Sequence, residues 1–523
     1  MPPVEAESPA TDLVRVLDDF FIENPQAAVL EDGRVIFDMA SARYSLSSEN
    51  GRCLLHLWSE ERNMVRTVCG VRERKDSLRI ESRRFGQSRP QFFEIVPTRD
   101  HRSPSTRDLA RTRYQHLLER VLTRAFPGWS VDNLRTATDL EHSFGPAYTR
   151  GVLRRGMTNW ALIAVNSEES PATIDGILTL GILWLAHCRE QGDGKRFFEG
   201  LKVVVPAGTS RTIKARMAWL NRFAAKYELY ELDARSEELA VIDCSESGNL
   251  QVKLMHAFNP RTALERCGKA IDRVLGLLDP GLRATAELRA NGPAEVSLAL
   301  HGLEFARIRR EFAANSFAIH DEVTFGAGAN ETPLTPENED LFRDLTQRLF
   351  ENRCESGTLR NPLYRLQPER WLESALRRDI AELEPGIRAE MIYTQVPALS
   401  AGDRGMLDLL TVTHSGQLAV IEVKADDDLH LPLQALDYWC RVRKLHREQA
   451  FQRHGYFPGI ELSDQPPMLY LIAPALRIHP ATDTVLSYLA AEIPWEVIGL
   501  NEDWRTRRKV ILRKRSGSLG PRN

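Results

Sequence analysis

The chain has 523 residues, of which 42% are hydrophobic and 27% charged, a balance typical of folded globular proteins. This composition excludes a disordered, collagen-like or disulfide-scaffold protein. Basic and acidic residues nearly cancel, 69 against 72, which leaves a net charge of −3 and no global field that would attract nucleic acid. Any nucleic-acid site must therefore be a local patch.

The cysteines and the apolar runs bear on where in the cell the protein is expected. The seven cysteines are widely spaced without a CxxC pair, which excludes a zinc ribbon and argues against a disulfide framework. The longest apolar run, Gly176–Ala186, has 11 residues, whereas a membrane span needs about 20. Residues 1–10 lack the basic and apolar segments of an export signal. We therefore expect a cytoplasmic protein with reduced thiols and no membrane association.

The N-terminal half contains two kinds of pattern. Residues 1–100 alternate apolar and polar positions in short runs, which predicts a β-rich module. Residues 101–255 alternate helical and strand patterns, which predicts an α/β module. The expected elements of this second module are a helix at 114–126, strands at 151–156 and 159–166, a helix at 174–190, a strand at 200–206, a helix at 215–226 and a strand at 227–232.

The same order recurs in the C-terminal half. Residues 256–335 are predicted to form a helix at 264–278 followed by β-strands, including a run at 295–309. Residues 336–523 are predicted to form an α/β domain. Its expected elements are helices at 341–350 and 368–380, strands at 406–412 and 418–424, a helix at 431–445, a strand at 468–474, a helix at 481–492 and a strand at 494–500.

Five landmarks of the first half recur in the second at offsets of 254 to 268 positions. This recurrence predicts a tandem duplication of a β-rich module followed by an α/β module. Chance similarity between two α/β domains is the alternative. The matched landmarks are Pro127 with Pro385, Arg150 with Arg404, Ala164 with Glu422, Pro206 with Pro474, and Tyr227 with Trp495.

Three charged residues stand in otherwise apolar predicted strands of the last domain. Glu422 and Lys424 lie two positions apart and so share one face of a strand, and Asp408 lies on the preceding strand. Two convergent carboxylates with water suit a hard cation such as Mg²⁺, and a neighbouring lysine can orient an attacking water. A surface salt-bridge set on an edge strand is the alternative, which the apolar flanking residues disfavour.

This arrangement resembles the PD-(D/E)xK nuclease superfamily over residues 365–500. Glu373 matches the acid of the family's first helix, Asp408 the motif aspartate, and Glu422 with Lys424 the ExK pair. The next helix contains Gln434 and Tyr438, which is similar to the QxxxY motif of RecB-type and lambda-exonuclease-type members. Leu407 replaces the proline that gives the family its name. The sequence contains neither the cysteine cluster of some RecB-type members nor a Walker A motif.

The resemblance implies a restriction-endonuclease-like core in the C-terminal half and a nuclease that uses Mg²⁺ or Mn²⁺. It implies that Asp408, Glu422 and Glu373 hold metal, that Asp408, Glu422 and Lys424 are catalytic, and that Gln434, Tyr438 and Arg404 bind nucleic acid. DNA is the expected substrate, in repair, recombination or defence. The alternatives are a nucleic-acid-binding protein without turnover and a structural subunit of a larger complex.

Aligning the two halves places uncharged or basic residues at the metal positions of the first half. Ala164 aligns with Glu422, Asn166 with Lys424, Arg154 with Asp408 and Gln115 with Glu373. The N-terminal α/β module is therefore expected to be a degenerate copy without a metal site. A fragment beginning near Asn330 would then keep every catalytic group.

The run Trp504–Arg515 has seven Lys and Arg residues. It predicts either a phosphate-binding face or a solvated terminal strand.

Overall fold

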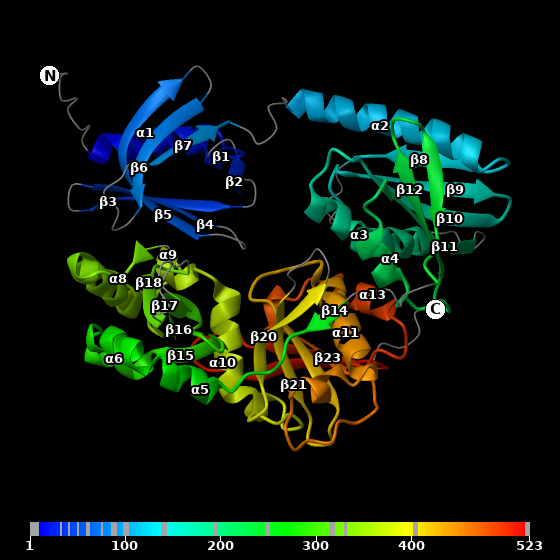
Figure 1. Cartoon of the computed structure of the whole chain (residues 1–523). Coiled ribbons are helices and arrows are strands. Elements are labelled where there is room, and N and C mark those ends of the chain that lie inside the picture. Colours follow the sequence, from blue (N-terminus) through cyan, green and yellow to red (C-terminus); the bar gives the residue numbers. More distant parts are fainter. Residues whose placement is uncertain are drawn as a thin grey trace. The chain divides into compact units, whose positions relative to one another are not determined.

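The structure, a computed structural model, describes residues 10–31, 34–39, 42–49, 52–58, 63–74, 77–84, 91–97, 104–137, 144–191, 197–245, 252–312, 319–328, 332–400 and 406–517. The chain is a mixed α/β protein with several sheets (Figure 1). It divides into two compact units, each built from two separate segments. Unit 1 comprises Met1–Ser103 and Phe258–Ala375, and unit 2 comprises Pro104–Ala257 and Leu376–Asn523.

This division brings the two β-rich segments into one unit and the two α/β segments into the other. The first two boundaries between the units, after Ser103 and after Ala257, lie close to the expected module ends at 100 and 255. The third falls at Ala375, inside helix α10 (Pro368–Leu383), and not near 335. We refer to Pro104–Ala257 as the N-terminal module of unit 2 and to Leu376–Asn523 as its C-terminal module.

The first sheet of unit 1 is antiparallel throughout, with the order β2-β1-β7-β6-β5-β4-β3. Helix α1 (Ala10–Glu23), which the alternation pattern did not predict, packs Leu13, Leu17 and Phe21 into the core of this sheet. Their helical spacing places all three on one face of the helix. The strands are β1 (Ala28–Glu31), β2 (Arg34–Asp38), β3 (Arg43–Glu49), β4 (Arg52–Trp58), β5 (Asn63–Arg74), β6 (Ser77–Arg84) and β7 (Gln91–Val96).

The second sheet of unit 1 is an antiparallel meander, β15-β16-β17-β18-β19. The apolar run at 295–309 is a hairpin, because His301 and Gly302 both adopt positive φ at its turn. The strands are β15 (Glu287–Gly292), β16 (Glu295–Leu300), β17 (Leu303–Phe312), β18 (Ile319–Phe325) and β19 (Thr332–Pro333). The helices of this segment are α5 (Pro260–Arg266), α6 (Gly268–Gly276), α7 (Pro280–Thr285), η1 (Pro336–Asn338), α8 (Glu339–Asn352) and α9 (Pro362–Arg365).

The N-terminal module of unit 2 contains a six-stranded sheet in the order β13-β12-β11-β10-β9-β8. Its strands are β8 (Ser130–Arg135), β9 (Tyr148–Arg155), β10 (Thr158–Val165), β11 (Phe197–Pro206), β12 (Lys226–Asp233) and β13 (Glu238–Ile242). Its helices are α2 (Pro104–Ala125), α3 (Pro171–Glu190) and α4 (Arg211–Met217), and α4 ends well before the expected 226.

Helix α3 is long and apolar enough by composition to cross a membrane. It packs on β10 and β11, and 61% of its most apolar window is buried inside the protein. Because the core helix of a soluble protein passes the same test, burial in unit 2 is sufficient to explain this apolarity.

The C-terminal module of unit 2 contains the sheet β14-β20-β21-β22-β23-β24-β25. Its strands are β20 (Tyr393–Ser400), β21 (Met406–Val412), β22 (Leu418–Val423), β23 (Met468–Pro474), β24 (Trp495–Leu500) and β25 (Val510–Arg515), and β14 (Val252–Leu254) joins from the N-terminal module. Its helices are α11 (Leu431–Arg447), α12 (Ala450–Arg453), η2 (Ala475–Arg477) and α13 (Thr482–Ser487), together with the end of α10.

Six strands of each sheet in unit 2 follow one pattern. β8 through β13 and β20 through β25 have the same neighbours, with two antiparallel steps, two parallel steps and one antiparallel step. The ladders also coincide in register, since Pro206 pairs with Leu232 and Pro474 pairs with Leu500. Both modules therefore place a helix, α3 or α11, directly after the third strand of this pattern.

One hydrophobic core extends through both modules of unit 2. It includes Leu178 and Leu185 of α3 together with Leu436 and Trp439 of α11. Strand β14 also pairs with β20 across the two modules. A fragment beginning near Asn330 would keep the predicted catalytic groups, but it would lack β14 and the part of this core that the N-terminal module supplies.

Candidate active site

Glu422 lies near the end of β22 and is 4% exposed. Strands β21 and β22 pair with Leu409 opposite Ile421. Continuing that register by one residue places the backbone of Asp408 opposite Glu422, where antiparallel partners are nearest neighbours. The side chain of Asp408 and the whole of Arg404 lie outside the described residues. The register therefore brings the two motif positions together at the level of the backbone.

The face of the sheet on which Glu422 lies follows from alternation along β22. Leu418 and Val420 pack into the core that includes α11. Glu422 is in phase with them, as is Lys424, because side chains two positions apart share a face. The amide of Lys424 also donates to the carbonyl of Ile472 on β23 at 3.0 Å, which holds this end of the strand. Glu422 and Lys424 thus belong to the side of the sheet that α11 covers.

Lys424 is connected to the first turn of α11 through Asp428. Its Nζ lies 3.3 Å from Oδ2 of Asp428, and both side chains are about one fifth exposed, 19% and 22%. The other carboxylate oxygen of Asp428 accepts the amide of His430 at 2.7 Å. Burial lowers the pKa of His430 below 6.5, and the nearby Asp428 carboxylate opposes this shift. Asp428 therefore couples the candidate catalytic lysine to the start of the helix.

Gln434 and Tyr438 lie one turn apart on α11, so they share a face of that helix. Both are partly buried, and Tyr438 packs against the core of unit 2. The guanidinium of Arg441 lies 5.8 Å from the centroid of the Tyr438 ring. Helix α11 itself packs on β22 and β23. The two predicted substrate-binding residues thus lie on the helix that directly follows the Glu422 strand.

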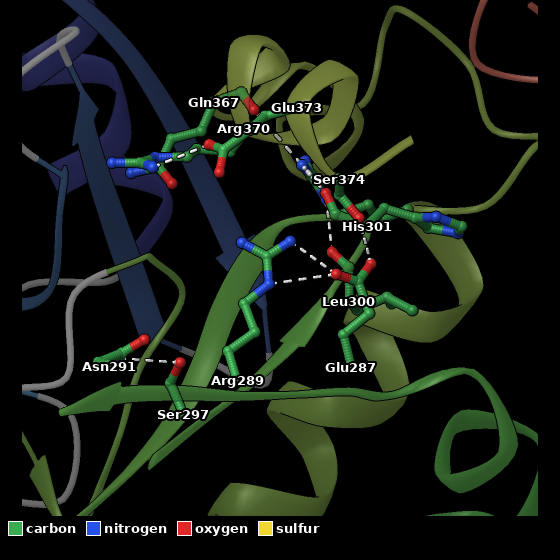
Figure 2. Close-up of polar contacts among 11 residues, drawn as sticks. Glu287, Arg289, Asn291, Ser297, Leu300, His301, Gln367, Arg370, Glu373 and Ser374 are labelled. Atoms are coloured by element: carbon green, nitrogen blue, oxygen red, sulfur yellow. Dashed lines mark hydrogen bonds and ion pairs between the residues drawn. The ribbon is translucent and has the colours of Figure 1, made fainter. Parts of the chain in front are cut away.

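Glu373 lies in the unit 1 part of α10 and is 2% exposed. One of its oxygens pairs with Arg370 of the same helix at 2.9 Å (Figure 2). Its Oε1 is buried and has no hydrogen-bond partner among the described residues. Glu373 belongs to unit 1 whereas Glu422 and Lys424 belong to unit 2.

The surroundings of Glu373 are a polar network that holds α10 in unit 1. Figure 2 shows Ser374 reaching Glu287 of β15, which also pairs with Arg289 at 2.6 Å. The fully buried Arg353 donates to backbone carbonyls at the β16–β17 turn and in the segment just before α10. Its acceptors are the carbonyl oxygens of Leu300, His301, Leu363, Leu366 and Gln367. These hydrogen bonds satisfy the donors of the guanidinium, whose burial without partners would cost free energy.

The described residues contain no group of three His, Cys, Asp or Glu side chains placed to hold a metal ion. They do supply a buried carboxylate, Glu422, two positions before Lys424 in the sequence. Mg²⁺ commonly binds through one or two carboxylates and keeps several waters. The chemistry of Glu422 therefore fits such an ion, with Asp408 as the second ligand that the backbone register offers.

The ladders change the equivalences between the two modules, by one residue on β10 and by four residues on β9. Glu422 pairs with Leu471 of β23, and Ile163 pairs with Val203 of β11. Leu471 and Val203 are equivalent, because each lies three residues before the matched proline, Pro474 or Pro206. Ile163, not Ala164, therefore occupies the position of Glu422, and Val165 that of Lys424. Since Ile163 pairs with Arg150, it is Arg150 and not Arg154 that corresponds to Asp408. Landmarks whose offsets range from 254 to 268 cannot resolve shifts of one to four residues.

Arg150 is 1% exposed, so the N-terminal module buries a cation at this position. Its guanidinium lies 4.4 Å from the centroid of the Phe144 ring and 5.8 Å from that of Trp184, and it donates to the carbonyl of Ala137. Aromatic faces attract a cation most when water is excluded. A protein cation thus occupies the sheet position that carries the motif aspartate in the other module.

Contacts between the two modules of unit 2 reach the candidate site, and the sequence analysis missed them. Nδ1 of His430 lies 3.1 Å from Oγ1 of Thr179 on α3. A methyl group on Gly176 would come within 2.8 Å of the His430 ring. Further along the interface, the rings of Trp219 and Trp439 meet edge to face at 4.8 Å. The two residues of each contact lie more than 200 positions apart in sequence, so local sequence patterns cannot predict these contacts.

The basic run Trp504–Arg515 is largely neutralised by carboxylates of its own module. Arg508 pairs with Asp379, Lys514 pairs with Asp483, and Arg513 pairs with both Glu384 and Glu496. Arg515 also contacts Glu496, at 2.9 Å. Phosphates would have to compete with these pairs, so the run is better described as a paired terminal strand than as a free phosphate-binding face.

No protein-family model matches this chain, and none of the curated proteins matches it either.

Proposed function

We propose that the chain is a metal-dependent nuclease that hydrolyses phosphodiester bonds of nucleic acid, DNA in the first instance, in repair, recombination or defence. The supporting observation is the β21–β22 register, in which Leu409 pairs with Ile421; continued by one residue it puts the backbone of Asp408 opposite the buried Glu422, with Lys424 two residues further along. The Gln434 and Tyr438 positions on the next helix add to it. We place the protein in the PD-(D/E)xK superfamily on the same grounds.

In this mechanism Asp408 and Glu422 would hold Mg²⁺ or Mn²⁺, which supplies charge stabilisation and lowers the pKa of a bound water. Lys424 orients the attacking water and offsets negative charge that develops on the phosphate. Asp428 holds the ammonium group at 3.3 Å and so keeps it from swinging into solvent. Gln434 and Tyr438 bind the substrate beside the strand.

We further propose that unit 2 arose by duplication and that its N-terminal module is a degenerate restriction-endonuclease-like copy. The shared order and directions of six strands in each sheet, and the matching register of their parallel ladders, support this. The residues at the three motif positions are Arg150, Ile163 and Val165, none of which can bind a divalent cation. Such a copy serves as a scaffold for its active partner.

A metal-dependent cleavage assay tests the proposed function. Supercoiled and linear DNA are incubated with the purified full chain in Mg²⁺, in Mn²⁺ and in a chelator. The Glu422→Gln variant removes the charge of the buried carboxylate, and Glu448→Gln serves as control because it removes the charge of a carboxylate that is 47% exposed and pairs with Lys444 near the end of α11. Cleavage by the wild type and the control, but not by Glu422→Gln, supports the proposal. DNA retention without cleavage by any protein favours the alternative, a binding protein without turnover.

A further inference from the structure

We infer that helix α3 of the N-terminal module positions the catalytic loop of the C-terminal module, with Thr179 as the positioning residue. The loop comprises residues 424–430 and ends at the first turn of α11. This inference rests on the proposed function, because it assigns the inactive module a task at the same site. It concerns placement of Lys424 and requires no contact between Thr179 and the substrate.

A continuous series of contacts connects the two modules at this place. Thr179 is fully buried and its hydroxyl lies 3.1 Å from Nδ1 of His430. The amide of His430 donates to Asp428 at 2.7 Å, and the second oxygen of Asp428 lies 3.3 Å from Nζ of Lys424. Each step is a single hydrogen bond or ion pair, so displacement of the His430 ring is transmitted to the lysine through two groups.

The packing around His430 leaves the ring little freedom. Gly176 lies one turn before Thr179 on α3, and any side chain there would meet Cε1 of His430 at 2.8 Å. The hydroxyl of Tyr148 lies within 3.2 Å of the same place and donates to the carbonyl of Thr173. Glycine therefore allows α3 to approach the ring closely, and the threonine hydroxyl then selects its orientation. A ring held in this way fixes the loop more tightly than a solvent-exposed histidine would.

The test replaces the hydroxyl of Thr179 with a methyl group in the full chain. Thr179→Val keeps the shape, Thr179→Ser restores the hydroxyl, and Tyr488→Phe removes a different hydrogen bond between the modules, that from Arg189 at 3.2 Å. DNA cleavage with Mg²⁺ is measured as kcat and KM. Amide hydrogen exchange of residues 424–434 is measured without DNA or metal, which gives a result that is independent of activity.

For Thr179→Val we expect kcat to fall on the order of tenfold with KM changed less than about threefold, because misplaced catalytic groups weaken the chemical step more than binding. The amides of residues 424–434 should exchange faster. Thr179→Ser and Tyr488→Phe should match the wild type in both measurements.

An unchanged kcat in Thr179→Val beside an active wild type would overturn the inference, as would unchanged amide exchange. Equal losses in Tyr488→Phe would also overturn it, because they would indicate a general effect of the interface. If the wild type does not cleave DNA but exchange rises only in Thr179→Val, the proposed nuclease function fails while the positioning of the loop stands.

Discussion

Arg216 of α4 and Asp437 of α11 form a two-bond ion pair between the modules of unit 2, with nitrogen–oxygen distances of 2.9 and 2.7 Å. Arg216 is 6% exposed and also donates to the carbonyl of Asp175 at 2.7 Å. Asp437 lies between Gln434 and Tyr438 in sequence, so this pair fixes the rotation of α11 about its axis. The modules are thus joined at the helix that carries the predicted substrate-binding residues.

Arg216→Ala should lower the free energy of unfolding by about 2 kcal/mol, because it removes charge-assisted hydrogen bonds to Asp437, whose side chain is 26% exposed and can be partly rehydrated. Urea unfolding of the full chain measures this loss. The control is Lys444→Ala, whose partly exposed pair with Glu448, one turn further along the helix, should contribute less than about 0.5 kcal/mol. Equal effects of the two substitutions would show that the Arg216 pair is no stronger than a surface pair.

Gly176→Ala should lower the thermal midpoint, although alanine favours a helix over glycine by about 1 kcal/mol. The added methyl would lie 2.8 Å from the His430 ring, which Thr179 holds in place, and such overpacking typically costs about 1 to 3 kcal/mol. Gly276→Ala at the end of α6 is the matched control, because no atom lies within 4 Å of its added methyl. This variant should be neutral or stabilised. A stabilised Gly176→Ala would contradict the close approach of α3 to His430.

Stability should fall as the pH drops through the range just below 6.5, in part because of His430. Burial lowers the pKa of His430 in the folded state, so the unfolded chain binds more protons in that range and acid favours unfolding. The contribution of His430 is complete above about pH 6.5 and disappears as the pH approaches the lower pKa of the folded state. His430→Asn should therefore lose less stability than the wild type between pH 7.5 and pH 5. His446, whose pKa is lowered mainly by burial, affects both proteins alike.

A fragment beginning near Asn330 should fail to fold cooperatively. It lacks β14, which pairs with β20, and it lacks the α3 and α4 surfaces that cover α11. Circular dichroism and a thermal scan of the fragment provide the measurement. A sharp unfolding transition near that of the intact chain would contradict the shared core.

Much of the architecture of unit 2 could be predicted because its strands are short apolar runs with clear ends. The strand at 200–206 and the helix at 174–190 are β11 and α3 with small changes at their ends. Predictions were less accurate where amphipathic patterns continue past the true end of an element. The expected helix at 215–226 stops at Met217, and Leu220 instead forms an isolated bridge with Leu489, just after α13.

The candidate site could be predicted only in part, because some of its features follow from the local sequence and others from contacts between distant residues. The strand position of Glu422 follows from alternation within a few residues. The contact between His430 and Thr179 joins residues 251 positions apart, and the pairing of β14 with β20 joins residues about 146 apart. Such contacts depend on how the two modules pack together, and the spacing of apolar residues along the sequence does not reveal that packing. The one-residue shift from Ala164 to Ile163 likewise required the ladder register.

The most direct test of the central claim is the rate of Mg²⁺-dependent DNA cleavage by Asp408→Ala, Glu422→Ala and Lys424→Ala beside the wild type, with DNA retention measured on the same samples. Gln434→Ala and Tyr438→Phe provide the comparison, since groups that only bind substrate should weaken affinity more than the chemical step. The account predicts cleavage by the wild type, loss of at least about a hundredfold in each of the three motif variants, and retained DNA binding. Wild-type cleavage that persists in all three variants would contradict it.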